Sequence, residues 1–445
     1  MGTVSYWHAR VETEQTAVPQ LIRSVGWLRD AHWMNRERAA AYSTIFVIAY
    51  VATMLSWLAL SENGVDRLGK AIGTDFTSFW AASRLALEGR APDVYQPAVH
   101  YRAQQAPFDG AGIGYSAFFY PPVYLLLCLP LALLPYLASL AVWLGLTGYA
   151  YWRMVRAYLG EHRWLALPAF AFPATFINIG HGQNGFLTAA LFGGGLLLLS
   201  RQPIVAGVLF GCLAFKPQLA LVLPIALLAA RRWRTILAAA ITAISLAGLS
   251  LIVFGIETWV NFSAVSSLAR AALEQNLVGN QKMQSAFAAV RLLGGHVILA
   301  YAVQAVVAVT VCGALVVLLR RHPGTTAEAP AVAAAALLIS PFLLDYDLLL
   351  LAVPLAWAAR EGARTGFLPW EKLVLMIGFL LPLLSRLFAT GLGIPLAPLA
   401  LLAVFGVVIR RAYRVSSPAW KTPTTESPTG KNPLPMKHAS REKTR

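Results

Sequence analysis

The chain has 445 residues, of which 58% are hydrophobic and only 13% charged, about half the charge of a soluble domain. Its mean hydropathy is +0.60 and its net charge +16. The basic residues stand at the ends of apolar runs, as at Arg231–Arg234 and Arg320–Arg321, and are not interleaved with aromatic residues on one face. This composition excludes an ordinary soluble protein and argues against nucleic-acid binding. It predicts an all-α, multi-spanning membrane protein whose basic clusters mark the cytoplasmic side.

The N-terminal region predicts a cytoplasmic segment followed by an uncleaved first span. Residues 1–40 are too polar and too long for a signal peptide, and Ala41–Leu60 is the first apolar run. The polar stretch 61–118 then lies on the outer side. Within it, Phe76–Glu88 places its large apolar side chains on one face, which predicts an amphipathic helix lying on the membrane surface.

The next apolar stretch, Phe119–Trp152, breaks the alternation of sides. It is too long for one span and divides into two near Pro135. Two full spans would place Arg153–Arg163 outside, against the charge rule. Either one half is re-entrant or the charge rule fails here, and the sequence leaves both alternatives open.

The middle of the chain returns polar residues to the outer side. Trp164–Ile179 runs outward and Phe186–Ser200 runs back, which leaves the polar motif 181–184 outside. Between Arg201 and Arg231, two short spans would satisfy both basic ends and place Lys216 at their outer apex.

The last third predicts a second outer loop and several further spans. Residues 255–296 form that loop, and the apolar runs after it bring Asp345 and Asp347 to the outer face. Two more spans lead to the tail 416–445, which is rich in Pro, Thr, Ser and Lys and predicts a disordered, basic, cytoplasmic segment. The transmembrane domain is thus expected over residues 41–415, with about 11–13 spans and short helix pairs.

Charge placement alone brings several polar residues to one side of the membrane. They are Asp75, His181, Gln183, Asn184, Lys216, Asp345 and Asp347. An ionisable group inside a span costs about 2.5–3.5 kcal/mol on insertion scales, and is therefore a functional candidate. Several such groups on one side predict a single polar site.

The order of short motifs resembles glycosyltransferase family 87 of the GT-C superfamily. The motifs are Gly73–Phe76, Arg84–Gly89, Asp93–Tyr95, Tyr120–Pro122, Gly182–Asn184, Ala206–Gly211 and Lys216–Pro217. The resemblance covers roughly residues 40–350, and it rests on the order and spacing of motifs that are individually short. The chain departs from actinobacterial members near Ser340-Pro341, where they carry Trp and His and this chain has Asp345 and Asp347.

The resemblance implies a bacterial plasma-membrane enzyme with an active site facing the extracytoplasmic side. Members include mannosyltransferases and arabinofuranosyltransferases that use polyprenyl-phosphate sugars. It implies that Asp75, in the first outer loop, is the general base of an inverting transfer, with a hexose such as mannose as the donor sugar and a glycan or glycolipid as the acceptor. The lipid-phosphate sugar is then a substrate, and we expect no cofactor, no metal and no nucleic acid.

Other residues are candidates for substrate binding. A phosphate leaving group needs a cation or several donors, for which Lys216 and Arg84 are candidates. The remaining candidates are Tyr120, His181, Gln183, Asn184, Gln281, Asp345 and Asp347, with Asn280 and Gln284 in the same loop as Gln281.

Each candidate also has a structural interpretation. Asp75 could cap the N-terminus of the following helix, and Lys216 could extend to the membrane interface. Tyr120 could be an interfacial anchor, and His181 could make a structural hydrogen bond at a span end. The aspartates 345 and 347 could mark the polar end of a span.

Two other classes of function compete with the transferase. A secondary transporter or flippase would predict inverted repeats and a polar site near the midplane, neither of which the sequence indicates. A lipid-linked polysaccharide polymerase or ligase would need a large outer loop late in the chain, whereas the large loops here come early and in the middle. The sequence therefore favours the transferase.

Overall fold

The computed structural model describes residues 26–415, so most of the predicted N-terminal segment and the tail 416–445 lie outside the described residues. Every regular element in the described range is a helix, which confirms the all-α prediction. Four helices there are long and apolar enough to cross a membrane. They are α2 (Arg36–Ala59), α13 (Trp233–Glu274), α15 (Val297–Arg321) and α18 (Glu371–Leu392).

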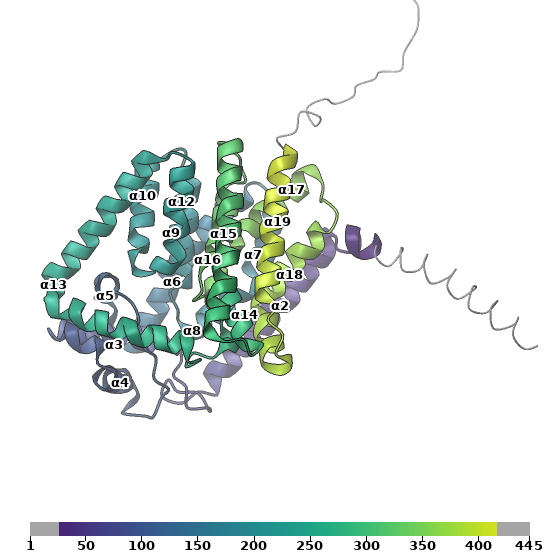
Figure 1. Cartoon of the computed structure of the whole chain (residues 1–445). Coiled ribbons are helices and arrows are strands. Elements are labelled where there is room, and N and C mark those ends of the chain that lie inside the picture. The colour runs from purple at the N-terminus through teal and green to yellow at the C-terminus, as the bar shows by residue number, and fades with distance from the viewer. Residues whose placement is uncertain (1–25, 416–445) are drawn as a thin grey trace, which may run out of the picture.

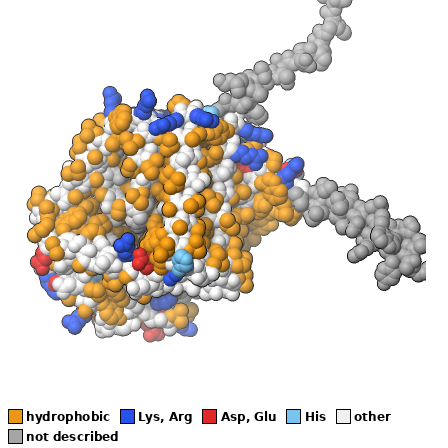
Figure 2. All heavy atoms as spheres, in the orientation of Figure 1, with side chains coloured by type: hydrophobic (Ala, Val, Ile, Leu, Met, Phe, Trp, Pro, Cys, Tyr) orange, Lys and Arg blue, Asp and Glu red, His pale blue; other side chains and the backbone are white. Residues whose placement is uncertain are grey.

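The spanning helices present apolar side chains outward. Only 6% of the most apolar window of α2, and 6% of that of α13, is buried inside the protein. Hydrophobic side chains cover most of the molecular surface between the two ends (Figure 2). So large an exposed apolar area is stable only against lipid. The chain is therefore an integral membrane protein.

Several apolar helices are too short to cross the bilayer. The pair α10 (Pro203–Gly211) and α12 (Val222–Ala229) is the clearest case. At 1.5 Å per residue, α10 is about 13 Å long, against about 30 Å of hydrocarbon. Lys216 lies in the segment between the two helices and is buried. The predicted 11–13 spans therefore include helices that extend only part of the way across the bilayer.

The helix of the first outer loop is present, but its predicted position is wrong. It spans Phe76–Leu87 (α3), and most of its side chains are buried within the protein instead of lying on the membrane surface. It packs against the short helices η1 (Ala91–Tyr95) and α4 (Pro97–Gln105) of the same loop. The loop folds over the helix and shields its apolar face from lipid.

The structure settles the side on which α5 (Pro122–Cys128) begins and ends. The ring of Tyr120, just before α5, packs on Phe79 of α3. Just after α5, the Ser83 hydroxyl of α3 donates to the carbonyl of Leu129 at 2.8 Å. Both ends of α5 therefore lie against the first outer loop, and the segment is re-entrant.

The segment that follows is the single helix α6 (Tyr136–Leu159). The hydroxyl of Tyr136, at its first residue, donates to the carbonyl of Ile72 at 2.7 Å, so α6 begins at the first outer loop. One helix therefore carries the chain from this loop to Arg153–Arg163 at its other end. Of the two alternatives, the structure supports the re-entrant one.

The second outer loop is largely helical. Helix α13 bends at Gly255, whose φ of 77° and ψ of 165° are not helical. Beyond the bend it runs across the end of the molecule that carries α3 and α4 (Figure 1). The Asn261 side chain donates there to the carbonyl of Pro92 at 3.2 Å, which joins the two outer loops.

The two ends of the molecule differ in charge. Lys and Arg side chains gather at the end where α15 and α19 (Ala397–Val415) terminate, at the top in Figure 2. The loops that carry α3 and α4 lie at the opposite end. At the basic end a buried ion pair between Arg411 and Glu371 ties α19 to α18. The loops predicted to lie outside and the basic side chains predicted to lie inside are therefore at opposite ends of the molecule.

Candidate active site

The segment just before α3 and the turn at Gly182 cross beside Asp75, and glycine residues allow their backbones to come into contact. Gly182 ends α8 (Pro173–His181) in the left-handed conformation, with φ of 63°. A Cβ there would lie 2.7 Å from the Cβ of Phe76 and 3.4 Å from the Cα of Gly73. The backbone N–H of Asp75 donates to the carbonyl of His181 at 2.9 Å across this crossing. Glycine is required because any side chain would separate the loops.

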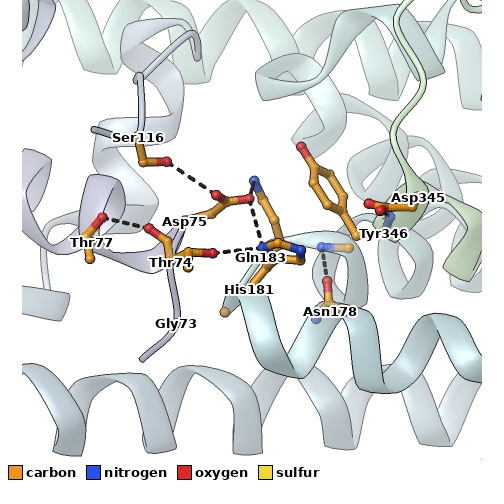
Figure 3. Close-up of polar contacts among 12 residues, drawn as sticks. Gly73, Thr74, Asp75, Thr77, Ser116, Asn178, His181, Gln183, Asp345 and Tyr346 are labelled. Atoms are coloured by element: carbon orange, nitrogen blue, oxygen red, sulfur yellow. Dashed lines mark hydrogen bonds and ion pairs between the residues drawn. The ribbon is translucent and has the colours of Figure 1, made fainter. Parts of the chain in front are cut away.

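Asp75 stands before the first turn of α3, yet its carboxylate makes no capping hydrogen bond, so the helix-cap interpretation is wrong. Its Oδ2 accepts from Gln183 Nε2 at 3.2 Å, and its Oδ1 accepts from Ser116 Oγ at 3.4 Å (Figure 3). The side chain remains 27% exposed. Neutral donors therefore hold the carboxylate while one face stays accessible.

His181 lies directly beside this carboxylate. Its Nδ1 is 2.8 Å from the Thr74 hydroxyl and 3.9 Å from Asp75 Oδ2 (Figure 3). Because Thr74 occupies Nδ1, Nε2 is the ring nitrogen left for another partner. The ring centroid lies 6.4 Å from that of Tyr346, so His181 sits between Asp75 and the segment that carries Tyr346.

The neighbouring residues of the 181–184 motif connect the two halves of the site. The Gln183 amide, besides donating to Asp75, accepts at Oε1 from the Tyr120 hydroxyl at 3.3 Å and from the Asn184 N–H at 2.7 Å. Asn184 Oδ1 accepts from Lys216 Nζ at 3.1 Å. One continuous hydrogen-bond chain therefore runs from Asp75 to Lys216.

Lys216 ends this chain in a buried ion pair. Its Nζ lies 2.5 Å from Asp347 Oδ1, and the two side chains are 3% and 1% exposed. The ammonium also lies 5.1 Å from the centre of the Tyr346 ring. Asp347 Oδ2 accepts from the N–H of Leu344 at 3.1 Å. Lys216 does not extend to the interface, and its charge is already balanced inside the protein.

Asp345 faces away from that pair. It is the first residue of the short helix η7 (Asp345–Leu351). Its Oδ1 accepts from the Tyr346 N–H at 2.9 Å, and its Oδ2 lies 3.7 Å from the guanidinium of Arg386. The carboxylate is buried, whereas Arg386 is 44% exposed. Asp345 and Asp347 are thus paired with different cations, Arg386 and Lys216 respectively.

Two predicted site residues lie apart from the cluster. Arg84 pairs with Glu88 at 3.1 Å on the exposed side of α3. Gln281 lies in η6 (Asn280–Lys282), whose loop is anchored by the Gln284 N–H donating to the carbonyl of Leu343. Across residues 26–415, no hydrogen bond joins Arg84 or Gln281 to the polar chain.

Sequence reasoning missed four residues of the cluster: Thr74, Ser116, Tyr346 and Arg386. Arg386 carried a usable signal, because an arginine inside an apolar helix is a functional candidate by the rule that selected Lys216. Thr74 and Tyr346 are next to predicted residues in sequence. Ser116 reaches Asp75 only because the loop folds back on itself, and nothing in its local sequence indicates this.

A cleft of about 830 Å³ opens beside the cluster, between α2, α8 and α18. Its polar end carries Thr74, His181, Asp345, Arg386, Asp66 and Lys70. Its remaining walls are mainly apolar and aromatic, from Tyr50, Met54, Trp57, Phe176, Ile177, Leu383 and Leu387. The site therefore combines a polar centre with an apolar approach from the membrane-spanning helices.

Comparison with known proteins identifies the family. The model of glycosyltransferase family 87 matches residues 118–341, about half of the chain. No curated protein and no solved structure matches the chain significantly. The matched segment contains Tyr120, the 181–184 motif and Lys216, and it ends just before Asp345, whereas Asp75 precedes it. The chain therefore belongs to glycosyltransferase family 87 and is a membrane-embedded glycosyltransferase.

Proposed function

We propose that this enzyme transfers a hexose, mannose in the first instance, from a polyprenyl-phosphate carrier to a glycan or glycolipid acceptor. The proposed reaction takes place on the extracytoplasmic side of a bacterial plasma membrane and inverts the anomeric centre. The lipid-phosphate sugar is a substrate, and the proposal includes no metal and no organic cofactor.

The observation that carries the proposal is the environment of Asp75. Its carboxylate is accessible, makes no helix cap, and accepts hydrogen bonds from the neutral groups of Gln183 and Ser116. A sugar hydroxyl is a poor nucleophile, so a positioned base must take its proton as the new bond forms. A carboxylate that is not neutralised by a bound cation is suited to that task.

The proposed step is a single displacement. The acceptor oxygen bonds to the anomeric carbon as the bond from that carbon to the phosphate oxygen breaks, and the bonding pair leaves with the phosphate. The acceptor proton passes to Asp75. The transition state is oxocarbenium-like, as in glycoside hydrolysis. Because Asp75 activates the acceptor on the face of the sugar opposite the leaving phosphate, the transfer inverts the anomeric centre.

The neighbouring groups support this assignment. His181 lines the cleft beside Asp75, and its Nε2, which Thr74 does not occupy, can bind a sugar hydroxyl or the phosphate. A transporter is less well supported, because the polar cluster adjoins the first outer loop at one end of the molecule instead of lying at the middle of the spans.

The test is transfer by the full-length protein in nanodiscs. The enzyme is incubated with radiolabelled polyprenyl-phosphate mannose and a lipid extract of its host, and the anomeric configuration of the product is read by NMR. We expect a labelled glycolipid or glycan of inverted configuration. A product of retained configuration would contradict the mechanism, and transfer only from another sugar would replace mannose.

A matched pair of variants tests the base. Asp75→Asn keeps the size of the side chain, and Asp109→Asn makes the same change at an exposed site in the same loop, where asparagine also tolerates the left-handed φ of 52°. We expect Asp75→Asn to lose about 10²–10⁴-fold in rate, the usual contribution of a general base, and Asp109→Asn to transfer normally. Equal rates in the two variants would remove Asp75 as the base.

A further inference from the structure

The cleft beside the site contains a cation with unused hydrogen-bonding capacity. Arg386 lies on the membrane-spanning helix α18 and lines the cleft. Within residues 26–415 its guanidinium makes one ion pair, at 3.7 Å to Asp345, and no hydrogen bond. A guanidinium has five N–H donors, and a charge on a spanning helix is costly unless it is partnered. These donors are available for an anion that enters the cleft.

The other cations considered for a phosphate are already engaged. Lys216 is buried against Asp347, so its charge is neutralised. Arg84 pairs with Glu88 on the exposed side of α3 and does not line the cleft.

Lys70 is the second cation of the cleft, and its ammonium makes no hydrogen bond or ion pair within the described part of the chain.

The acidic groups of the cleft are turned to other partners. Asp66 accepts from the N–H groups of Leu68 and Lys70 and from the indole of Trp57. Asp345 holds Arg386 from the buried side and leaves the rest of the guanidinium exposed. Arg386 and Lys70 both line the cleft, and the side chain of Arg386 is 44% exposed.

We propose that this cleft binds the lipid-linked phosphate, with Arg386 and Lys70 on the phosphate and the apolar walls of α2, α8 and α18 on the isoprenoid chain. The walls and the cations match the two chemical parts of such a molecule. His181 and Thr74 line the polar end of the cleft and contact each other next to Asp75, so the sugar of a phosphate held at Arg386 would project toward the base.

The position assigned to the sugar rests on the proposed function, whereas binding of the lipid phosphate does not. Lipid binding in the cleft and sugar transfer can therefore be refuted separately. The helices α2 and α18 and the residues Arg386 and Lys70 all lie outside the segment 118–341 that identifies the family. The cleft is thus an assignment made from the contacts and charges of this chain.

The probe is a photoactivatable polyprenyl monophosphate that carries no sugar. The full-length protein in phosphatidylcholine nanodiscs is labelled, digested and mapped by mass spectrometry, and competition is measured with unlabelled polyprenyl monophosphate and with phosphatidylglycerol. We expect labelled peptides from α2 and α18. Labelling should fall when unlabelled polyprenyl monophosphate is added and persist in phosphatidylglycerol.

Paired variants separate the phosphate contact from the apolar groove. Arg386→Gln should reduce labelling about 10-fold or more, as expected for a lost charge-assisted hydrogen bond, and Arg386→Lys should restore part of it. Arg84→Gln is the matched control and should label normally. Thr390→Trp, which fills the cleft, should block labelling, whereas Ile377→Trp, exposed on α18 outside the cleft, should not.

Kinetics distinguish binding from chemistry. In Arg386→Gln the KM for the lipid donor should rise by the same factor as the loss of labelling, with a smaller change in kcat. Undiminished labelling in both Arg386→Gln and Thr390→Trp would overturn the inference, even if sugar transfer proceeds. Equal competition by phosphatidylglycerol would also overturn it, because the cleft would then be a general lipid site. Loss of labelling without transfer from any tested sugar would support the cleft and count against the proposed function.

Discussion

The two ends of the polar chain contain carboxylates in contrasting surroundings. Asp347 is 1% exposed, lies 2.5 Å from Lys216 Nζ and accepts from a backbone N–H. Asp75 is 27% exposed and accepts longer hydrogen bonds, 3.2 and 3.4 Å, from neutral side chains. The first carboxylate is neutralised and joins distant helices. The second keeps its charge available to a substrate, so position on one side of the membrane does not by itself distinguish a reacting group from a structural one.

The largest effect expected on stability comes from Asp347→Leu. The change leaves the Lys216 ammonium buried without its partner, and breaking a buried pair in this way costs about 3–5 kcal/mol. Thermal unfolding in detergent should show a large fall in Tm. The double variant Lys216→Met with Asp347→Leu should recover much of the loss, since no unpaired charge remains. If the single and double variants unfold at the same temperature, the pair is not a coupled unit.

Behind Asp75, the uncharged side chains of His100 and Gln104 hold the backbone of Ser116 in place. Because His100 is neutral in the folded protein, the stability of the fold should depend on pH. Burial lowers the pKa of His100 to about 4, from an ordinary value of 6.5. The His100 ring lies 3.1 Å from the carbonyl of Ser78 and 3.2 Å from the Gln104 amide, which in turn accepts from the N–H of Ser116. A carbonyl only accepts, so Nε2 carries the proton and Nδ1 accepts from Gln104 in the neutral ring.

The stability contributed by neutral His100 is present above pH 6.5 and is lost as the pH falls toward 4, because the unfolded chain binds the proton first. The full difference is about 3 kcal/mol. Tm measured from pH 7.5 to 4.5 should fall in the wild type. In His100→Asn, which starts less stable, the fall should be smaller. Parallel Tm curves for the two proteins would contradict the assignment.

The loop crossing beside Asp75 predicts an intermediate effect for Gly182→Ala. Alanine in the left-handed conformation costs about 1–2 kcal/mol, and its Cβ would lie 2.7 Å from the Cβ of Phe76. Both Tm and the transfer rate should fall, because the loops must separate. Gly148→Ala, within α6, meets only ordinary contacts at 3.6 Å and should be neutral or slightly stabilising. Equal behaviour of the two alanine variants would show that the crossing tolerates a side chain.

The smallest effect is expected for Arg84→Gln. The Arg84–Glu88 pair is exposed, and such pairs contribute about 0–1 kcal/mol. Transfer should stay within about twofold of the wild type, and Tm should be nearly unchanged. A large loss of transfer would restore Arg84 as a phosphate ligand, as the sequence suggested.

The sequence predicted the helical class and the convergence of distant polar motifs, since apolar runs and basic ends report which residues face lipid and which face water. It could not predict pairing. Lys216 looked like a free cation because its partner Asp347 is 131 residues away, and hydropathy carries no information on such contacts. The pairing of Arg84 with Glu88 is likewise not contained in the hydropathy pattern, whereas Arg386 was overlooked although its position in an apolar helix marks it as a candidate. The burial of α3 depends on the way residues 88–134 fold over it, which the helical pattern of Phe76–Glu88 does not contain.

The central claim is that Asp75 reacts while the Lys216–Asp347 pair positions the site. The most direct test measures the single-turnover transfer rate and Tm side by side for wild type and Asp75→Asn, with saturating polyprenyl-phosphate mannose. We predict a Tm close to that of the wild type and a transfer rate lower by about 10²–10⁴-fold. A folded Asp75→Asn protein that transfers at the wild-type rate would contradict the account.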